Sequence, residues 1–232
     1  MIHTMQKPTQ TLFAQISKRY DITNDVLSLG IHRYWRYCAT KSIPLQGTER
    51  VLDLCTGTGD CALSFARKTP RPAQIVGIDF SPEMILLAQR KLDAQNPAAD
   101  IDFRVGDATA LPFPDGSFDV VSICFGIRNI PDISKAFSET RRVLKPKGTL
   151  IILEFGGLPE SSILSFYLKR LLPMIGGWVS GNRTAYNYLQ ETSQAFPSGK
   201  RFGETLEEHG FSDVTIKPHL WGTAWRYTAQ KI

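Results

Sequence analysis

Short apolar runs alternate with longer amphipathic stretches through the middle of the chain. The runs predict five strands, and two more near the C-terminus complete a sheet: Arg50–Leu54, Gln74–Asp79, Ile101–Val105, Phe118–Cys124, Thr149–Glu154, Asp213–Lys217 and Ala224–Ala229. The stretches between them predict helices over Cys61–Lys68, Pro82–Ala94 and Ile133–Leu144. This alternation is typical of an α/β fold in which helices cover both faces of a doubly wound, mostly parallel seven-stranded sheet.

Two of these helices carry clear end signals. Ser81 is a suitable N-cap, and Pro82 suits the first helical position that follows it. The third helix is expected to stop at Lys145-Pro146-Lys147-Gly148, because proline cannot continue a helix and glycine permits a reversal of the chain.

Composition narrows the classes of protein that need consideration. Lys and Arg number 27 against 22 Asp and Glu, and the resulting charge of +5 permits contact with anionic lipid, although an ordinary solvated surface also explains it. No basic run is long enough to mark a nucleic-acid-binding tail, so we expect no nucleic-acid partner. The four cysteines lack CxxC spacing, so we expect neither a metal site nor a disulfide framework, which suits a reducing cytoplasm. No apolar run approaches the roughly 18 residues of a spanning helix.

Candidate chemistry begins where the first predicted strand ends. Gly57-Thr58-Gly59 follows that strand, and glycines let a backbone turn sharply and approach a ligand closely. The same letters also fit a plain strand-to-helix turn. Asp79 ends the second strand, 20 residues after Gly59, where this fold class places an acid on ribose hydroxyls.

A third strand end adds Asp107 and Ala108, where a carboxylate and a backbone N–H can bind an adenine ring. A turn aspartate is the structural alternative. The loop lacks the third glycine of a pyrophosphate-binding GxGxxG motif, so a nicotinamide dehydrogenase is disfavoured. The three strand ends together favour a nucleoside without phosphates.

This arrangement resembles class I S-adenosylmethionine methyltransferases. Leu111-Pro112-Phe113, Phe118-Asp119-Val120 and Arg142-Val143-Leu144-Lys145-Pro146 add to the likeness. The resemblance implies S-adenosylmethionine as cofactor. Its methionine part would lie at Thr58 with Gly57 and Gly59, its ribose at Asp79 and its adenine at Asp107 and Ala108, while Cys124 would line the pocket at the end of the fourth strand.

Other segments look like the quinone-biosynthesis C-methyltransferases, which methylate demethylmenaquinol and a benzoquinol precursor of ubiquinone. They are Tyr20-Asp21, Asn24-Asp25, Gly30-Ile31-His32-Arg33-Tyr34-Trp35-Arg36, Phe125-Gly126-Ile127-Arg128-Asn129-Ile130, Tyr186-Asn187-Tyr188-Leu189 and Phe196-Pro197. The chain departs from that family at Cys55, Lys147, Cys124 and the tail after His219. The resemblance implies methylation of a ring carbon of a prenylated quinol.

The same resemblance proposes Arg128, Asn129 and Tyr20 as catalytic residues. Arg128 would stabilise a developing phenolate while a water or a carboxylate accepts the proton. A structural ion pair is the alternative for Arg128. His32 and Asp25 are further base candidates, each with an ordinary role as a helix-end cation or a capping acid.

We expect one domain of 232 residues. It would comprise an N-terminal helical cap (1–47), a cofactor-binding core (48–155), a substrate-side insertion (156–200) and C-terminal strands that complete the sheet (201–232). In the insertion, Ile163–Val179 suits a prenyl channel, a peripheral membrane contact or a plain core helix. The sequence leaves open whether the chain forms a homo-oligomer. It also leaves open two other functions: methylation of another small molecule or lipid, and nucleoside binding without catalysis.

Overall fold

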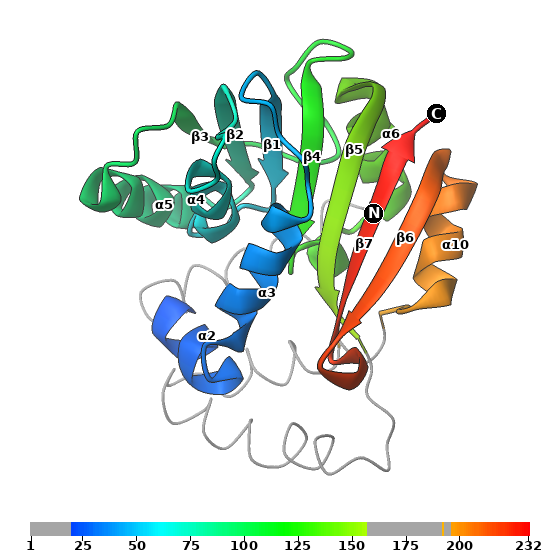
Figure 1. Ribbon diagram of the computed structural model, residues 1–232, viewed down its shortest axis with the longest axis horizontal. Helices are drawn as coiled ribbons and strands as arrows, with labels where there is room; N and C mark the ends of the chain where they lie inside the picture. The colour runs from blue at the N-terminus through cyan, green and yellow to red at the C-terminus, as the bar shows by residue number, and fades with distance from the viewer. Residues whose placement is uncertain (1–19, 157–191, 193–195) are drawn as a thin grey trace.

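The computed structural model describes residues 20–156, 192 and 196–232, in which seven strands form one sheet (Figure 1). The strands are β1 Arg50–Leu54, β2 Gln74–Asp79, β3 Ile101–Val105, β4 Phe118–Cys124, β5 Leu144–Phe155, β6 Phe211–His219 and β7 Ala224–Lys231. Their order is β3-β2-β1-β4-β5-β7-β6, and β1 to β5 pair in parallel. β7 runs antiparallel to both β5 and β6. The predicted doubly wound, mostly parallel sheet is confirmed.

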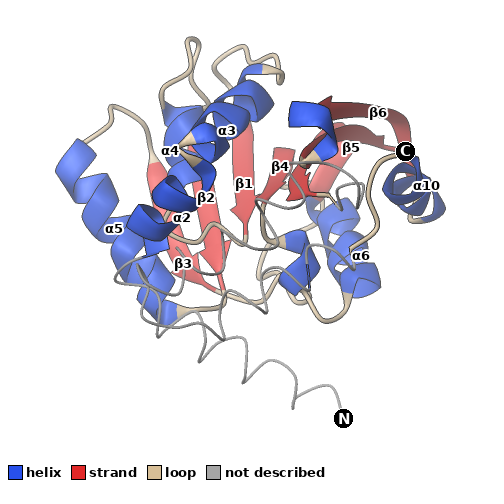
Figure 2. Ribbon diagram, turned by 90° about the horizontal axis from the view of Figure 1, so that it is seen from below, coloured by secondary structure: helices blue, strands red, loops and turns tan. Residues whose placement is uncertain are grey.

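Helices cover both faces of this sheet (Figure 2). The helical elements are α2 Tyr20–Ser28, α3 Ile31–Lys41, α4 Asp60–Ala66, α5 Pro82–Gln95, η2 Ile127–Asn129, α6 Ile133–Val143, α10 Lys200–Glu208 and η4 Leu220–Gly222. On one face Trp35 of α3 and Phe65 of α4 join a buried apolar cluster, and on the other Phe137 of α6 and Phe202 of α10 join a second. Because both faces are covered, β1 and β4 are mainly apolar and are buried along almost their whole length.

The first four strands match their predicted bounds, and the predicted start of α5 is also found. Ser81 caps α5 by accepting a hydrogen bond from the backbone N–H of Met84, and Pro82 opens the helix. Helix α4 begins at Asp60, one residue earlier than predicted, and ends at Ala66.

The turn into β5 differs from the prediction. Helix α6 ends at Val143 and β5 begins at once at Leu144, five residues before the predicted start. The left-handed backbone lies at Lys147, with φ 61°, and not at Gly148. A Cβ on Gly148 would approach the carbonyl oxygens of Lys145 to 2.8 Å and Asp119 to 3.2 Å. Gly148 is therefore needed for close packing, and the prediction that it permits the reversal was wrong.

Helix α10 lies in the segment where only strands were predicted. Its buried side chains include Phe202 and Leu206, which are four residues apart and therefore share one helical face. This spacing is visible in the sequence and could have revealed the helix. The predicted segment Ile163–Val179 and most of the predicted insertion lie outside the described residues.

All five parallel strands end at one edge of the sheet. In Figure 1 their arrows point to the lower edge, where α2 and the start of α3 lie. This edge therefore brings together the residues that follow β1, β2, β3 and β4, although they are far apart in the sequence.

Candidate active site

The loop after β1 owes its path to residues with left-handed backbone. Cys55, Gly57 and Gly59 have φ values of 53°, 56° and 82°. A Cβ on Gly59 would lie 2.7 Å from the Phe103 ring, so only glycine fits there. A Cβ on Gly57 would meet nothing within 4 Å, because this residue faces open space. The loop thus packs tightly on one side and offers bare backbone on the other.

Asp79 holds this loop in place from the end of β2. Its carboxylate accepts hydrogen bonds from the backbone N–H of Gly57 at 2.8 Å and of Ser81 at 3.0 Å. Burial raises the pKa of Asp79, whereas the two N–H donors act in the opposite direction. One side chain therefore joins the β1 loop to the start of α5.

Most of the predicted site residues line a single cavity at the carboxyl edge. They are Gly57, Thr58, Asp79, Asp107, Ala108, Cys124 and Asn129. Gly59 supports the loop by its packing and is not among the residues that line the cavity. Further walls come from Ile78, Phe80, Met84 and Pro131.

Strand order arranges these residues in a row. Asp107 follows β3, Asp79 ends β2, Thr58 follows β1 and Cys124 ends β4, and these four strands are neighbours in that order. Adjacent strands lie about 4.8 Å apart, so the row extends over about 14 Å. Its apolar walls at Ile78, Phe80 and Met84 suit a flat ring at the Asp107 end, and its polar groups suit a ribose and an amino acid beyond it. The residues present fit S-adenosylmethionine.

Asp107 also forms a turn, as its structural alternative predicts. Its Oδ1 accepts hydrogen bonds from the backbone N–H of Thr109 at 2.8 Å and from the Thr109 hydroxyl at 2.9 Å. These bonds fix the carboxylate at the rim of the cavity. The turn and a ligand contact are thus compatible for this residue.

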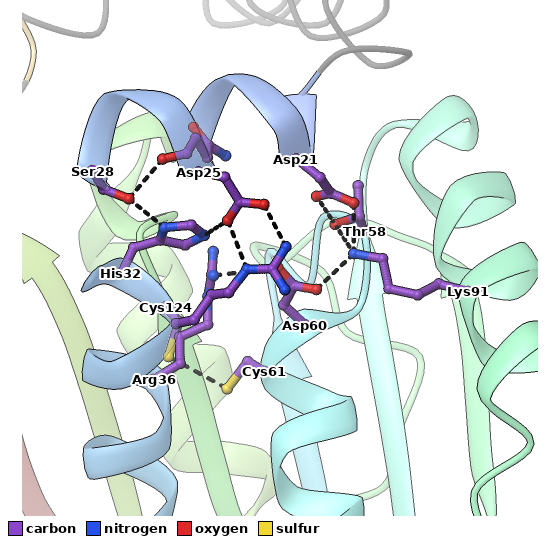
Figure 3. Close-up of polar contacts among 12 residues, drawn as sticks. Asp21, Asp25, Ser28, His32, Arg36, Thr58, Asp60, Cys61, Lys91 and Cys124 are labelled. Atoms are coloured by element: carbon purple, nitrogen blue, oxygen red, sulfur yellow. Dashed lines mark hydrogen bonds and ion pairs between the residues drawn. The ribbon is translucent and has the colours of Figure 1, made fainter. Parts of the chain in front are cut away.

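A network of ion pairs ties the N-terminal helices to the β1 loop (Figure 3). The Thr58 hydroxyl donates to Asp21 of α2 at 2.7 Å and accepts from Lys91 of α5 at 2.9 Å. Lys91 also pairs with Asp21 at 2.7 Å and with Asp60 at 2.6 Å. Sequence reasoning gave no role to Lys91 or Asp60, because their partners are 24 or more residues away and no local pattern marks such pairs.

Asp60 and two further charged residues line the cavity and were not predicted to do so. Arg36 of α3 pairs with Asp60 at 3.3 Å and places its guanidinium 5.3 Å from the centre of the Phe125 ring. Asp53, the penultimate residue of β1, accepts hydrogen bonds from the hydroxyls of Thr56 and Ser122, both at 2.6 Å. Burial raises the pKa of Asp53.

Arg128 lies beside the cavity, in a buried ion pair. Its guanidinium contacts the carboxylate of Glu154 and donates to the carbonyl oxygen of Phe125 at 3.2 Å. The two side chains are 5% and 1% exposed, so both charges are shielded from water. Burial raises the pKa of Glu154, and the positive charge of Arg128 opposes that shift. This geometry matches the structural alternative, and the catalytic role of Arg128 stays a prediction.

Asn129 faces the cavity, and Tyr20 begins α2. The Oδ1 atom of Asn129 is buried, and no described residue gives it a hydrogen bond. A buried acceptor without a donor is costly, so this atom is a natural contact for a bound hydroxyl or N–H. The Tyr20 side chain lies outside what the structure describes, and its role stays a prediction.

His32 belongs to the helical cap and not to the cavity. It lies 2.5 Å from the Ser28 hydroxyl and 3.6 Å from the Asp25 carboxylate. Burial, with the nearby charge of Arg36, lowers the pKa of His32 to about 4, so the ring is neutral at neutral pH. Among the described positions, no group of three or more His, Cys, Asp or Glu side chains could hold a metal ion.

Fold and cavity together define an S-adenosylmethionine-dependent methyltransferase, and comparison with known proteins places it more narrowly. The model of the ubiE/COQ5 methyltransferase family matches residues 1–231. The chain belongs to this family of quinone-biosynthesis C-methyltransferases.

Individual relatives agree with this placement. The ubiquinone/menaquinone biosynthesis C-methyltransferase UbiE of Geobacter sulfurreducens is 44% identical, over 95% of this chain and 87% of the relative. The demethylmenaquinone methyltransferase of Thermus thermophilus is 43% identical, over 87% and 91%. A solved S-adenosylmethionine-dependent methyltransferase from Thermotoga maritima has a TM-score of 0.69 at 17% identity, over 96% of this chain and 99% of that one. This last likeness concerns the fold alone.

Proposed function

We propose that this enzyme methylates a ring carbon of a prenylated quinol, with demethylmenaquinol preferred over the benzoquinol precursor of ubiquinone. The observation that carries the proposal is the row of Asp107, Asp79, Thr58 and Cys124 along one cavity, in a chain of this family. The names of the relatives from Thermus thermophilus and Deinococcus radiodurans support the naphthoquinol substrate.

Each end of the cavity has a proposed partner in the cofactor. Asp107 and the backbone of Ala108 bind the adenine, Asp79 binds the ribose hydroxyls, and Thr58 with Gly57 holds the methionine part, while Gly59 supports their loop by its packing. Cys124 lines the far end, beside the β1 loop. When bound, S-adenosylmethionine supplies an electrophilic methyl group on a sulfonium.

The protein's main task is then to align an electron-rich ring carbon with that methyl and to exclude water. Good alignment can contribute about 7–11 kcal/mol to lowering the barrier. Asn129 is suited to orient the acceptor, because its buried Oδ1 can accept a hydrogen bond from a ring hydroxyl. Arg128 and Tyr20 complete the proposed catalytic set, and Glu154 is the carboxylate that lies beside Arg128.

Methyl transfer to defined acceptors tests the proposal. The enzyme is incubated with labelled S-adenosylmethionine and either reduced demethylmenaquinone or the reduced benzoquinone precursor, and the products are identified by mass spectrometry. We expect a ring-methylated naphthoquinol as the faster product. Methylation of the benzoquinol alone would overturn the preference. Tight cofactor binding without transfer to either quinol would overturn the proposed acceptor class.

Peripheral membrane contact is part of the proposal, because a prenylated quinol resides in a bilayer. Within the described ranges, no helix is both long and apolar enough to cross a membrane. The sequence of Ile163–Val179, with Lys169 and Arg170, supports contact through the insertion. Liposome flotation of the wild type against the Lys169→Ala/Arg170→Ala variant tests it. Equal recovery would overturn docking through this segment.

We also propose that the enzyme forms a homo-oligomer, which sedimentation analysis would test.

A further inference from the structure

Two cysteines meet at the Thr58 end of the cavity, and the proposed function uses only Cys124, as part of the cavity wall (Figure 3). Cys61 lies in the first turn of α4 and Cys124 is the last residue of β4. Their sulfur atoms are 3.4 Å apart, and both residues line the cavity beside Thr58 and Asp53. The two cysteines are 63 positions apart, so the fold alone brings the thiols together.

Neither cysteine is in a disulfide, and both are buried. Contact with Cys124, together with burial, raises the pKa of Cys61 well above that of an exposed thiol. A protonated thiol is a weak nucleophile, so we expect a reagent that bonds to a single sulfur to react slowly with Cys61. A reagent that can bond to both sulfurs binds more tightly, because its second bond forms within the same molecule once the first has formed.

We propose that Cys61 and Cys124 form a two-thiol binding site for trivalent arsenic, and that this site overlaps the pocket of the methyl donor. Sulfur ligands suit soft ions, and the described residues offer no third cysteine or histidine that would complete a zinc site. When one pyramidal arsenic atom bonds to two sulfurs, the two bonds diverge at roughly a right angle, so the sulfurs lie in non-bonded contact. The sulfurs of Cys61 and Cys124 already lie at such a distance. A linear two-coordinate ion would need them farther apart.

The reaction with a monosubstituted arsenical oxide balances without any oxidant. Each sulfur forms one bond to arsenic, and the arsenic–oxygen double bond breaks. The two thiol protons leave with that oxygen as one water molecule, and arsenic stays trivalent. The product fills the end of the cavity where Thr58 lies, so it excludes the methionine part of the methyl donor; this competition rests on the proposed function.

Phenylarsine oxide is the probe, and adducts are read by intact mass and peptide mapping. We expect one phenylarsenic group per chain, bridging Cys61 and Cys124 and removed by dithiothreitol. Saturating S-adenosylhomocysteine should slow its formation at least tenfold. Cys61→Ser and Cys124→Ser should each weaken binding at least 100-fold. Cys38→Ser removes a thiol outside the cavity and Cys55→Ser a thiol that lines it, and both should bind as the wild type does.

An adduct mapped to Cys38 or Cys55, or undiminished binding by Cys61→Ser or Cys124→Ser, would overturn the site. Undiminished adduct formation in wild type saturated with S-adenosylhomocysteine would overturn the overlap. Should either serine variant fail to fold, as judged by circular dichroism, mapping and protection in the wild type decide alone. Calorimetry that finds no S-adenosylhomocysteine binding to the wild type would count against the proposed function, and peptide mapping would still test the dithiol site.

Discussion

The two halves of the carboxyl edge are built on different principles. In the half made by β1, β2 and β3, carboxylates bind backbone N–H groups close by: Asp79 holds Gly57 and Ser81, and Asp107 holds Thr109. In the half made by β4 and β5, the buried carboxylate of Glu154 is paired with the guanidinium of Arg128. The first half is therefore held by hydrogen bonds from backbone N–H groups to carboxylates, and the second by an ion pair between two buried side chains.

This difference predicts different responses to mutation. Losing a carboxylate in the first half should loosen the cofactor pocket and leave the core intact. Losing one partner in the second half leaves an unpaired buried charge, which is costly wherever it occurs.

Arg128→Ala is expected to have the largest effect. Removing one partner of a buried pair costs about 3–5 kcal/mol, so the free energy of unfolding in urea should fall by that amount. Turnover should fall at least tenfold while cofactor affinity stays nearly intact. Arg104→Ala, which breaks an exposed pair with Asp102, is the matched control and should cost less than about 1 kcal/mol.

The turnover of folded Arg128→Ala protein decides between the two interpretations of this residue. Unaltered turnover per folded molecule would make the Glu154 pair purely structural and would remove Arg128 from the mechanism. Arg128→Lys keeps the charge without the planar fork and should recover stability in part.

The buried ring of His32 offers a pH test of the N-terminal helical cap. The unfolded chain takes up a proton on this ring below pH 6.5, whereas the folded chain does so only near pH 4. Stability should therefore be fully present above pH 6.5 and fall as pH is lowered, with about 3 kcal/mol lost below pH 4. Urea unfolding of His32→Asn across this window should lack that component. Parallel curves for the two proteins would contradict the burial of a neutral ring.

Asp79→Asn tests the first half directly. The amide keeps the shape but removes the charge that binds Gly57, Ser81 and the proposed ribose, and hydrogen bonds to charged groups contribute about 1.5–3 kcal/mol. Calorimetry with S-adenosylhomocysteine should show about 100-fold weaker binding, and urea unfolding should show a smaller loss. Asp102→Asn, at an exposed position on β3, is the control and should bind normally. Comparable affinities for Asp79→Asn and wild type would remove Asp79 from the cofactor site.

The sequence predicted the two halves to different extents, and the same physics explains why. Strand ends, glycines and the Ser81 cap are local signals, so β1 to β4 and the cavity residues Gly57, Thr58, Asp79 and Asp107 could be predicted from local patterns, whereas Cys124 and Asn129 came from the family resemblance. The Arg128–Glu154 pair, the Asp21–Lys91–Asp60 network and the Cys61–Cys124 contact join distant segments, and no local pattern marks them. The early start of β5 escaped prediction because Pro146 was taken as the end of a helix, whereas it lies within the strand.

The glycine loop gives the smallest expected effect and the finest comparison, because Gly57 and Gly59 differ in what surrounds them. In Gly59→Ala the new Cβ would lie 2.7 Å from Phe103 and 3.2 Å from Ala88, so stability should fall by about 2 kcal/mol in urea unfolding. Gly57→Ala meets no atom within 4 Å and carries only the strain of its left-handed backbone, about 1 kcal/mol. Its methyl group would instead enter the open space where we place the cofactor, so it should weaken S-adenosylhomocysteine binding more than Gly59→Ala does. The reverse order of affinities would show that the ligand approaches the loop from another side.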